Sequence, residues 1–433
     1  MNKKKVKIKT FVLLLILSSF VFSQEGPSGL FPGKEFSLLY SEINTYPVSS
    51  KDVICFYSFR IPYDHLVFVK NDSGYMAKFS LGVEVYDSLG NFADRQIKQD
   101  DISVKSYDET NSDNEYYQGI LTFKLTRKSY NFLPVFTDIN SKEERKLNKI
   151  YLALNSDKYD KLLPPVFANS LKEKCGDRES EVLTNFNGFL PFSSNKYDII
   201  IPSVDTTLTN LKVIIASDKD TIYNSNLKES SVFSINLQSC NNQIYFDRYN
   251  TLSLPTRNFI IKGISTRIPE GNLSFFYSFN DGEKPAVVQY QKCVWFNKPH
   301  SLYNPEFAIK ILSYFSGKEE VEKLLDAKEK DYPQVLNDFW KKYDPTPSTG
   351  FNELMSEYYK RVDYTEMNFS SLSGKKGYDL DRGKVYIQFG KPQKIERSSD
   401  SEGKVVETWY YDKEKKFIFV DKLGTGDFPL QNK

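Results

Sequence analysis

Hydrophobic and polar residues alternate along the first part of the chain, and this period-two pattern is typical of half-buried β-strands. It is clearest in residues 78–85 and 121–125, and the first of these runs ends at the turn-forming segment 87–91. Shorter apolar runs at 53–60 and 150–154 add further strands. Because no helical period separates these strands, the pattern predicts a β-sandwich of immunoglobulin-like kind over residues 36–154.

A second series of strands follows a polar segment. Residues 155–181 are polar, contain Pro164 and Pro165, and are predicted to form a connector. Residues 182–300 then carry strand patterns at 197–201, 211–217, 232–236, 258–262, 272–279 and 286–296. Polar turn clusters such as 217–220 join them. We therefore expect a second β-sandwich over residues 182–300.

The apolar period changes from two to about 3.6 at Asn304. An Asn followed by Pro305 is a typical helix start, because Asn caps the first turn and Pro fits the first helical position. Apolar stripes at helical spacing then predict helices near 304–315, 321–325, 335–340 and 354–369. The helical segment 301–370 is expected to cover a small C-terminal sheet with these stripes.

The last segment, residues 371–433, is predicted to be a small antiparallel α+β domain. Gly377 and Gly383 bracket a turn. Residues 384–389 alternate as a strand does, and Gly390 with Pro392 ends that strand. Two further strands, 407–412 and 416–421, complete the expected meander. The fold class is therefore mainly β: two sandwiches, a helical segment and this small domain.

The run from Gly377 to Gly383, followed by the turn at Gly390 and Pro392, resembles the GWxTD domain of exported bacterial proteins. The similarity covers residues 337–430, because 339–347 and 358–362 look like the helical lead-in of such domains. Two positions depart from the motif: Tyr378 stands in place of Trp, and Leu380 in place of Thr, which removes a hydroxyl suited to capping a turn or to binding a ligand. The resemblance implies an architecture and a compartment but no activity. The motif or binding candidates are Gly377, Tyr378, Asp381, Arg382, Gly383, Tyr386, Gly390, Pro392 and Trp409.

The N-terminus has the pattern of a secretory signal peptide. Five lysines precede an apolar core at 11–17, and cleavage after Ser23 is predicted. Residues 1–23 are therefore the expected signal peptide and 24–35 an N-terminal linker. The apolar core is shorter than the roughly 20 residues that span a bilayer, and no later segment is long and apolar enough, so we expect no transmembrane segment in the mature chain. The expected location is periplasmic or extracellular.

Composition argues against several classes of function. The 58 basic and 56 acidic residues give a net charge of +2, so no strong field attracts nucleic acid. The chain has only two histidines, His65 and His300, which are far apart and lack metal-ligand spacing. We therefore expect no metal site, no cofactor and no histidine-based catalysis.

Four cysteines occur, and in an exported chain they allow disulfides with three possible pairings. Cys240 and Cys293 lie in the same predicted sandwich and are the first candidates for a bridge. Cys55, within an apolar strand, is predicted to be a buried thiol.

Three functional hypotheses remain from the sequence. The preferred one is a non-enzymatic cell-envelope scaffold or binding protein that docks an envelope protein, or a glycan, through the C-terminal domain. The second is a hydrolase of envelope glycans or peptides that uses two carboxylates among Asp379, Asp381, Glu407, Asp412 and Asp421. The third is carbohydrate binding in which Trp409 or Tyr410 stacks on a sugar ring, since neighbours on a strand face opposite sides.

Overall fold

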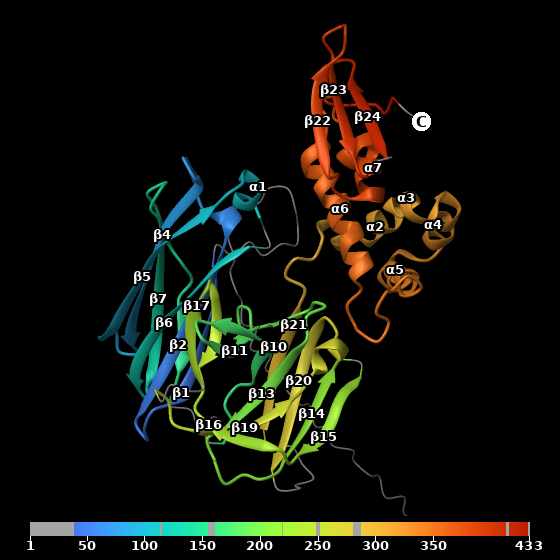
Figure 1. Ribbon diagram of the computed structural model, residues 1–433. Coiled ribbons are helices and arrows are strands. Elements are labelled where there is room, and N and C mark those ends of the chain that lie inside the picture. The colour runs from blue at the N-terminus through green and yellow to red at the C-terminus, as the bar shows by residue number, and fades with distance from the viewer. Residues whose placement is uncertain are drawn as a thin grey trace, which may run out of the picture. The chain divides into compact units, whose positions relative to one another are not determined.

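The computed structural model describes residues 39–112, 115–154, 161–218, 220–247, 252–279, 287–412 and 415–431 (Figure 1). The predicted signal peptide, 1–23, and the linker, 24–35, lie outside these residues. Within the described ranges no helix is both long enough and apolar enough to cross a membrane. The fold is mainly β, with several antiparallel sheets, a helical segment and a small C-terminal sheet.

The first unit consists of two antiparallel sheets that pack face to face. The three-stranded sheet has the order β1 (Tyr40–Pro47), β2 (Asp52–Pro62) and β6 (Tyr116–Thr126). The other has the order β3 (Val69–Asn71), β4 (Gly74–Asp87), β7 (Ser129–Asp138) and β8 (Glu143–Lys146), with β5 (Phe92–Val104) paired to β4 and β9 (Ile150–Ala153) to β7. One core joins Phe59 and Phe123 of the first sheet to Phe79 and Phe132 of the second. The predicted packing of two sheets is present, whereas the immunoglobulin-like topology stays a prediction.

Two short helical elements join strands of this unit. They are η1 (Tyr63–His65) and α1 (Tyr107–Thr110), the latter capped by Ser106, whose hydroxyl accepts a hydrogen bond from the Glu109 amide.

The second unit also has two sheets with a shared core. The seven-stranded sheet has the order β16 (Ser230–Phe233), β19 (Thr256–Ile261), β13 (Tyr197–Ser203), β10 (Val166–Cys175), β11 (Arg178–Leu183), β18 (Gln243–Asp247) and β17 (Asn236–Cys240). The five-stranded sheet has the order β12 (Leu190–Pro191), β21 (Val287–Val294), β20 (Gly271–Phe279), β14 (Leu211–Ser217) and β15 (Thr221–Leu227). The short helix η3 (Ile264–Arg267) packs on β13.

The predicted connector, 155–181, is in part a piece of this unit. It contains β10 and the start of β11, which lie in the middle of the seven-stranded sheet. The second half of β10 is polar and half-exposed, so it lacks the apolar alternation that would have identified a strand.

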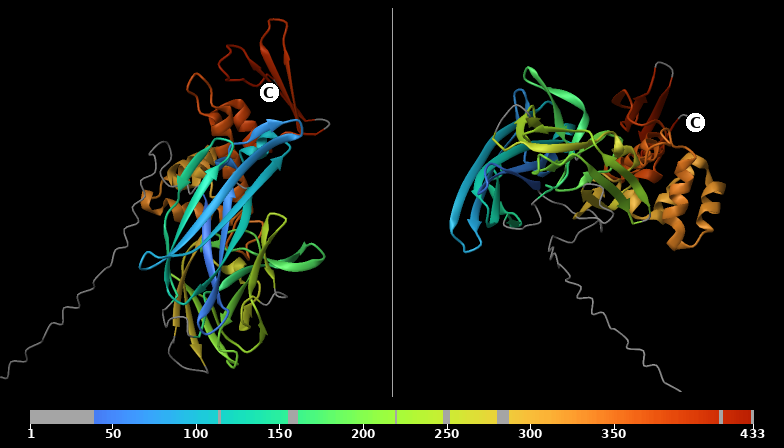
Figure 2. Two further views of the ribbon diagram at one scale, coloured as in Figure 1. Left: turned by 90° about the vertical axis from the view of Figure 1, so that its left-hand side faces the viewer. Right: turned by 90° about the horizontal axis from the view of Figure 1, so that it is seen from below.

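Strand β2 is buried on both faces and thereby connects the two units. Figure 2 shows the blue strands of the first unit beside green and yellow strands of the second. Tyr57 and Phe59 point into the first core, whereas Ile54 and Phe56 pack in another core with residues of the seven-stranded sheet such as Phe246. A strand that is covered on both sides reads as a continuous apolar run instead of an alternating one.

The helical segment begins after η4 (His300–Tyr303) and contains α2 (Pro305–Ile311), α3 (Ser313–Ser316), α4 (Lys318–Leu325), η5 (Glu329–Asp331), α5 (Tyr332–Lys341) and α6 (Glu353–Phe369). As predicted, Asn304 caps α2: its side chain accepts a hydrogen bond from the Phe307 amide at 3.0 Å. The apolar stripes form one core around Trp340 and Tyr359. The prediction that these helices pack against the C-terminal sheet is therefore largely wrong, because most of their apolar residues pack against one another.

The C-terminal sheet is an antiparallel meander of β22 (Lys394–Ser399), β23 (Val405–Tyr410) and β24 (Lys416–Asp421). Residues 384–389, predicted as a strand, instead belong to the helix α7 (Asp381–Phe389), which packs on the sheet together with the end of α6. The prediction failed because the consecutive residues Val385, Tyr386 and Ile387 are all buried. A helix that is buried on several sides lacks the single apolar stripe with a 3.6-residue period that would identify it. Strand β22 is exposed along its whole length and gave no apolar signal.

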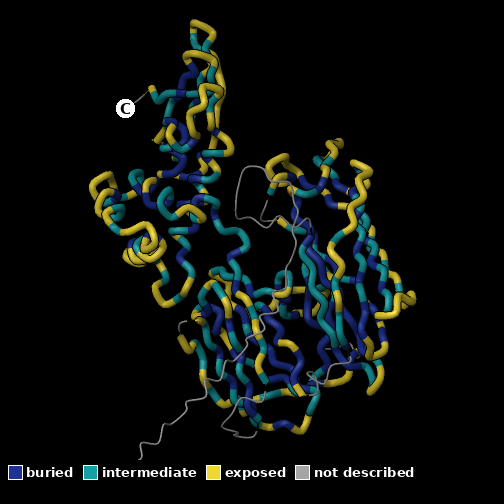
Figure 3. The backbone as a smooth tube through the Cα atoms, turned by 180° about the vertical axis from the view of Figure 1, so that it is seen from behind, coloured by how far each residue is buried: buried dark blue, intermediate teal, exposed yellow. Residues whose placement is uncertain are grey.

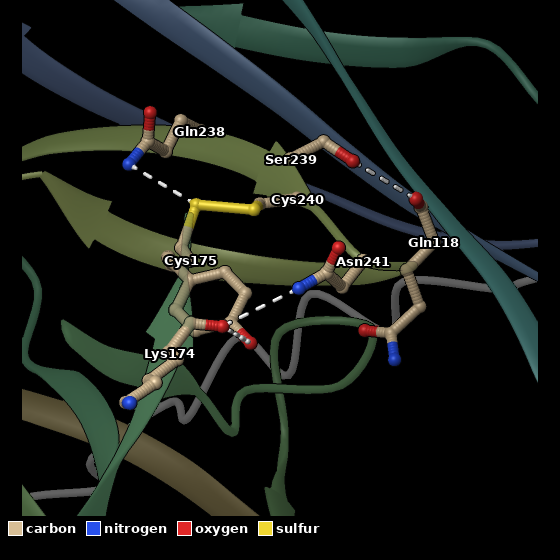
Figure 4. The surroundings of a disulfide bond; sticks show 8 residues. Gln118, Lys174, Cys175, Gln238, Ser239, Cys240 and Asn241 are labelled. Carbon is tan, nitrogen blue, oxygen red and sulfur yellow. Dashed lines mark hydrogen bonds between the residues drawn. A yellow bond between two sulfur atoms is a disulfide. The ribbon is translucent and has the colours of Figure 1, made fainter. Parts of the chain in front are cut away.

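The predicted bridge between Cys240 and Cys293 is wrong. Cys240, at the end of β17, is bonded to Cys175 at the end of β10, and their Cα atoms are 5.8 Å apart (Figure 4). Cys293 and Cys55 are free and buried, the latter as expected. Burial raises the pKa of the Cys293 thiol to about 12. The bridge ties the β10–β11 hairpin to the β17–β18 hairpin, which sequence separation could not reveal.

Candidate functional site

The motif glycines lie where three backbone segments touch. A Cβ atom on Gly377, in the short helix η6 (Gly377–Asp379), would stand 1.7 Å from the carbonyl oxygen of Thr365 in α6. A Cβ on Gly383 in α7 would stand 1.9 Å from the carbonyl oxygen of Gly377. Only hydrogen fits at either position, so both glycines are required for α6, η6 and α7 to pack backbone against backbone.

The two residues that depart from the motif have different roles. The ring of Tyr378 packs on that of Phe307 in α2 with 5.1 Å between centroids, so it joins the helical core. Leu380 is the N-cap residue of α7, and its side chain makes no capping hydrogen bond. A Thr at this position would place a hydroxyl where it could accept from an amide of the first turn. The Thr of the motif is therefore best explained as a helix cap.

Asp381 and Arg382 connect α7 to the last strands and loops. The Asp381 carboxylate accepts a hydrogen bond from the Leu430 amide at 3.0 Å. The Arg382 guanidinium lies between the rings of Phe369 and Phe428 and donates to the Gly426 carbonyl at 2.9 Å. Burial lowers the pKa of Arg382, although the charge of Glu407 opposes this shift.

Glu407 is the buried counter-charge of this cluster. Its side chain is 2% exposed and lies 3.3 Å from Arg382 Nη1. Arg397 Nε donates to it at 2.8 Å, and Trp409 Nε1 at 3.2 Å. Three donors from two strands and a helix thus satisfy one carboxylate, as a buried charge requires.

The remaining motif residues complete the core and the end of α7. Tyr386 stacks on Tyr364 with ring centroids 4.5 Å apart, and Trp409 is 1% exposed. Gly390 ends α7 with a φ of 77°, and its carbonyl accepts from the Tyr411 hydroxyl at 2.8 Å. Pro392 is buried. The structure therefore gathers the motif residues from Gly377 to Trp409, apart from Tyr378 in the helical core, into one packed junction of helix and sheet.

The carboxylates of the hydrolase hypothesis also have partners within the fold. Asp379 accepts from the Tyr314 hydroxyl at 3.0 Å, and Asp412 from the Lys415 amide. Asp421 accepts from the amides of Thr425 and Gly426. No cluster of three or more His, Cys, Asp or Glu side chains suited to a metal ion occurs within the described ranges.

Two exposed loops beside this junction were not identified from the sequence. We call residues 371–375 and 422–426 the loop pair. Leu372 is 90% exposed and Leu423 81%, and the Leu372 amide donates to the Thr425 carbonyl at 2.9 Å. In Figure 3 many residues of the C-terminal region, near the label C, are yellow, the colour of exposed residues. The sequence did contain a signal for these loops: each has a large apolar residue, Leu372 or Leu423, within a Ser- and Gly-rich turn.

The loop pair is fixed by Asp427. Its carboxylate accepts from the Ser373 hydroxyl at 2.9 Å and forms an ion pair of 2.5 Å with Lys375. The hydrogen bond from Lys375 is the main cause that lowers the pKa of Asp427 to about 2. A separate surface hollow of about 300 Å³ lies at the starts of α2 and α5, where no motif residue lines it.

Comparisons with known proteins identify one family. Residues 280–425 match the GWxTD domain. A comparison with curated proteins found no match. Among solved structures, the C-terminal domain of the antigen I/II-family protein AspA from Streptococcus pyogenes aligns with 59% of this chain and 100% of its own, at 10% identity and a TM-score of 0.15, which does not indicate a shared fold. The matched range contains α2 to α7 as well as the meander, so residues 280–425 of this protein are a GWxTD domain.

Proposed function

We propose that this protein is a non-enzymatic binding or scaffold protein of the cell envelope, which docks a partner protein through its GWxTD domain. The predicted signal peptide supports an exported, soluble protein. The observation that carries the proposal is the loop pair, which presents two almost fully exposed leucines on an ordered support.

The motif residues supply that support. Arg382 holds the second loop by its hydrogen bond to Gly426, and Asp421 holds the same loop by accepting from two of its amides. The first loop ends two residues before Gly377, whose amide donates to Glu366 and Ser370 at 3.1 Å each. In this view the motif acts indirectly, because it builds and orders the surface that binds.

The energetics of this surface favour binding. Burial of one exposed Leu side chain at an interface is worth about 1.5–3 kcal/mol. Loops that are ordered before binding lose little conformational entropy when the complex forms. Burial of the exposed leucines against a partner therefore has a lower free energy than their exposure to solvent.

The other two hypotheses have weaker support. Glycoside hydrolysis needs two carboxyl groups about 5–9.5 Å apart across a cleft, and the carboxylates considered above are engaged with donors of the fold. Trp409 lies in the core, so stacking on a sugar ring would fall to Tyr410, whose hydroxyl donates to Glu396 at 2.9 Å.

Site-specific photo-cross-linking in the native cell tests the docking proposal. A photoreactive residue would replace Leu372 or Leu423, and Leu171 would serve as a matched control because it is 74% exposed on β10, outside the GWxTD domain. We expect the same partner at positions 372 and 423 and not at 171. Absence of an adduct at 372 and 423, or the same adduct at 171, would overturn the proposal.

Hydrolysis is tested separately on purified protein. Wild type, Asp381→Asn and Glu407→Gln would be incubated with envelope glycans and peptides, and circular dichroism would confirm their folding. We expect no turnover by any of the three. Turnover by wild type that is lost in a folded Asp381→Asn variant would establish the hydrolase hypothesis instead.

A further inference from the structure

Strand β15 forms one edge of the five-stranded sheet of the second unit. It pairs with β14 on one side, from Leu211 with Leu227 to Ala216 with Thr221. Its other side pairs with no strand in the described part of the chain. The unpaired amides and carbonyls of an edge strand are a template for a further strand.

This edge differs from the other long edges in its lack of charge. The sequence of β15 is Thr-Ile-Tyr-Asn-Ser-Asn-Leu, without a charged residue or a proline. The other described edge strands of more than five residues all carry charges, among them β5 with Asp94, Arg95, Lys98, Asp100 and Asp101, and β22 with Lys394, Glu396 and Arg397. β1, β6 and β24 contain Glu42, Lys124 and Lys416, respectively. Charged residues protect an edge from pairing, so β15 is the unprotected one among these long described edges.

The charges that flank β15 point to its partner. Asp220 directly precedes the strand, Lys228 directly follows it, and both are exposed. If a second β15 pairs with it antiparallel and in register about Asn224, Thr221 lies opposite Leu227 of the second copy. In the same register Asp220 lies opposite Lys228 of the second copy, and Lys228 opposite its Asp220. A shift by two residues in one direction loses both attractions, and in the other direction it exchanges them for pairs between Lys228 and Asp218 of the second copy. Only the register about Asn224 gives Asp220 an opposite charge as well.

We propose that two copies of this chain associate through antiparallel pairing of their β15 strands, with Asn224 on the two-fold axis. The two five-stranded sheets then form one continuous sheet across the dimer. Such an interface is isologous, because the same strand serves both copies.

The residue on the axis suits this arrangement. Asn224 is exposed and lies opposite Ile214 of β14. An Asn amide carries both a donor and an acceptor, so two identical side chains can hydrogen-bond across the axis. Three half-buried residues of β15 pack against the core of the second unit: Ile222, Tyr223 and Leu227. Their exposed area would also decrease when the second copy pairs with β15.

Cysteine cross-linking tests the register. Directly opposite residues of an antiparallel pair have Cα atoms about 4.5–5.5 Å apart, within reach of a disulfide. Asn224→Cys in the full chain should therefore form a covalent dimer under mild oxidation. Asn226→Cys is the matched control, because its counterpart in the second copy lies about 13 Å away along the strand. The free cysteines Cys55 and Cys293 are buried and should not interfere.

Charge reversal tests the flanking pairs. Sedimentation of the full chain should show that Asp220→Lys or Lys228→Asp alone weakens dimerisation about tenfold, because each creates two repulsive pairs. An equimolar mixture of the two variants should dimerise again, since both pairs become attractive in the mixed dimer. The proposal would be overturned by a monomer at all concentrations. A dimer would also overturn the proposal if it met two conditions together. Charge reversal at Asp220 or Lys228 would leave dimerisation unchanged, and the Asn224→Cys variant would cross-link no better than the Asn226→Cys variant.

Discussion

Gly383 lies directly against the carbonyl oxygen of Gly377, so close that a methyl group on Gly383 would stand 1.9 Å from that oxygen. Gly377 in turn lies against the Thr365 carbonyl of α6. The two motif glycines thus form a stack that sets the distance between α6 and α7. This contact explains the motif without any chemistry at the glycines.

We expect Gly383→Ala to lower the free energy of unfolding of the GWxTD domain by about 3 kcal/mol or more, because a backbone carbonyl cannot move aside as a flexible side chain can. Tryptophan fluorescence suits this measurement, since Trp295, Trp340 and Trp409 all lie within residues 280–425. Gly82→Ala in β4 is the control: its Cβ would meet nothing closer than 3.9 Å, and the change should be nearly neutral. Because β4 lies outside residues 280–425, both variants are also followed by far-ultraviolet circular dichroism. Equal effects of the two substitutions would contradict the stack.

Leu380→Thr should be more stable than Leu380→Val by about 1 kcal/mol, the usual value of an N-cap side chain. The two variants have nearly the same shape, so both lose the same burial of Leu380 and differ only in the hydroxyl. Urea unfolding of the pair isolates the cap. No difference between Thr and Val would show that the hydroxyl of the motif serves another purpose.

Arg382→Met should destabilise the GWxTD domain by about 3 kcal/mol or more, because it removes one partner of a buried ion pair and leaves Glu407 with less compensation. The double variant Arg382→Met with Glu407→Gln should recover part of this loss, since the buried charge is then absent. Unfolding of the single and double variants measures the coupling. A double variant as unstable as the sum of both single variants would argue against the pair.

Loss of the bridge between Cys175 and Cys240 should cost about 4 kcal/mol, because it releases a loop with a sequence separation of 65 residues in the unfolded chain. Cys175→Ser is the variant, and Cys293→Ser the control that leaves the bridge intact. Peptide mapping without reduction would show the linkage directly. A bridge that contains Cys293 would contradict the structure.

The half-buried Glu42 should make stability pH-dependent. Burial raises the pKa of Glu42 above its ordinary value of 4.5, while the charge of Arg60 and a hydrogen bond from the Gly188 amide at 2.7 Å act in the opposite direction. The folded state therefore binds the proton more tightly than the unfolded state, and the contribution of Glu42 to stability is lost as the pH rises through the raised pKa. The advantage of wild type over Glu42→Gln should shrink as the pH rises above 4.5 in thermal unfolding experiments. An advantage that grows with pH would contradict this assignment.

Local patterns predicted much of the secondary structure. The strand at Leu211–Ser217 and the helix that starts at Asn304-Pro305 lie where the alternation and the capping residues place them. These signals depend on residues within one or two turns of each other, so the sequence contains them in full. The GWxTD domain was likewise identified from a short run of residues.

Features that depend on burial were not predictable. The run around Val385, Tyr386 and Ile387 resembles a strand but folds as α7, because neighbours from α6 and the meander cover most of the helix. Strand β10 was missed because its exposed half has no apolar pattern. A residue pattern records which positions are apolar and does not record which surface covers them.

Local residue patterns were enough to locate the motif and the α-helical segment and to assign the rest of the chain to the β-rich class. The packing of helices and sheets was needed to establish that Gly377 and Gly383 touch carbonyl oxygens, that Cys240 bonds to Cys175, and that Arg382 and Arg397 share Glu407. Each of these contacts joins residues from different elements, and their distances are set by how the helices and sheets pack, which no local pattern specifies.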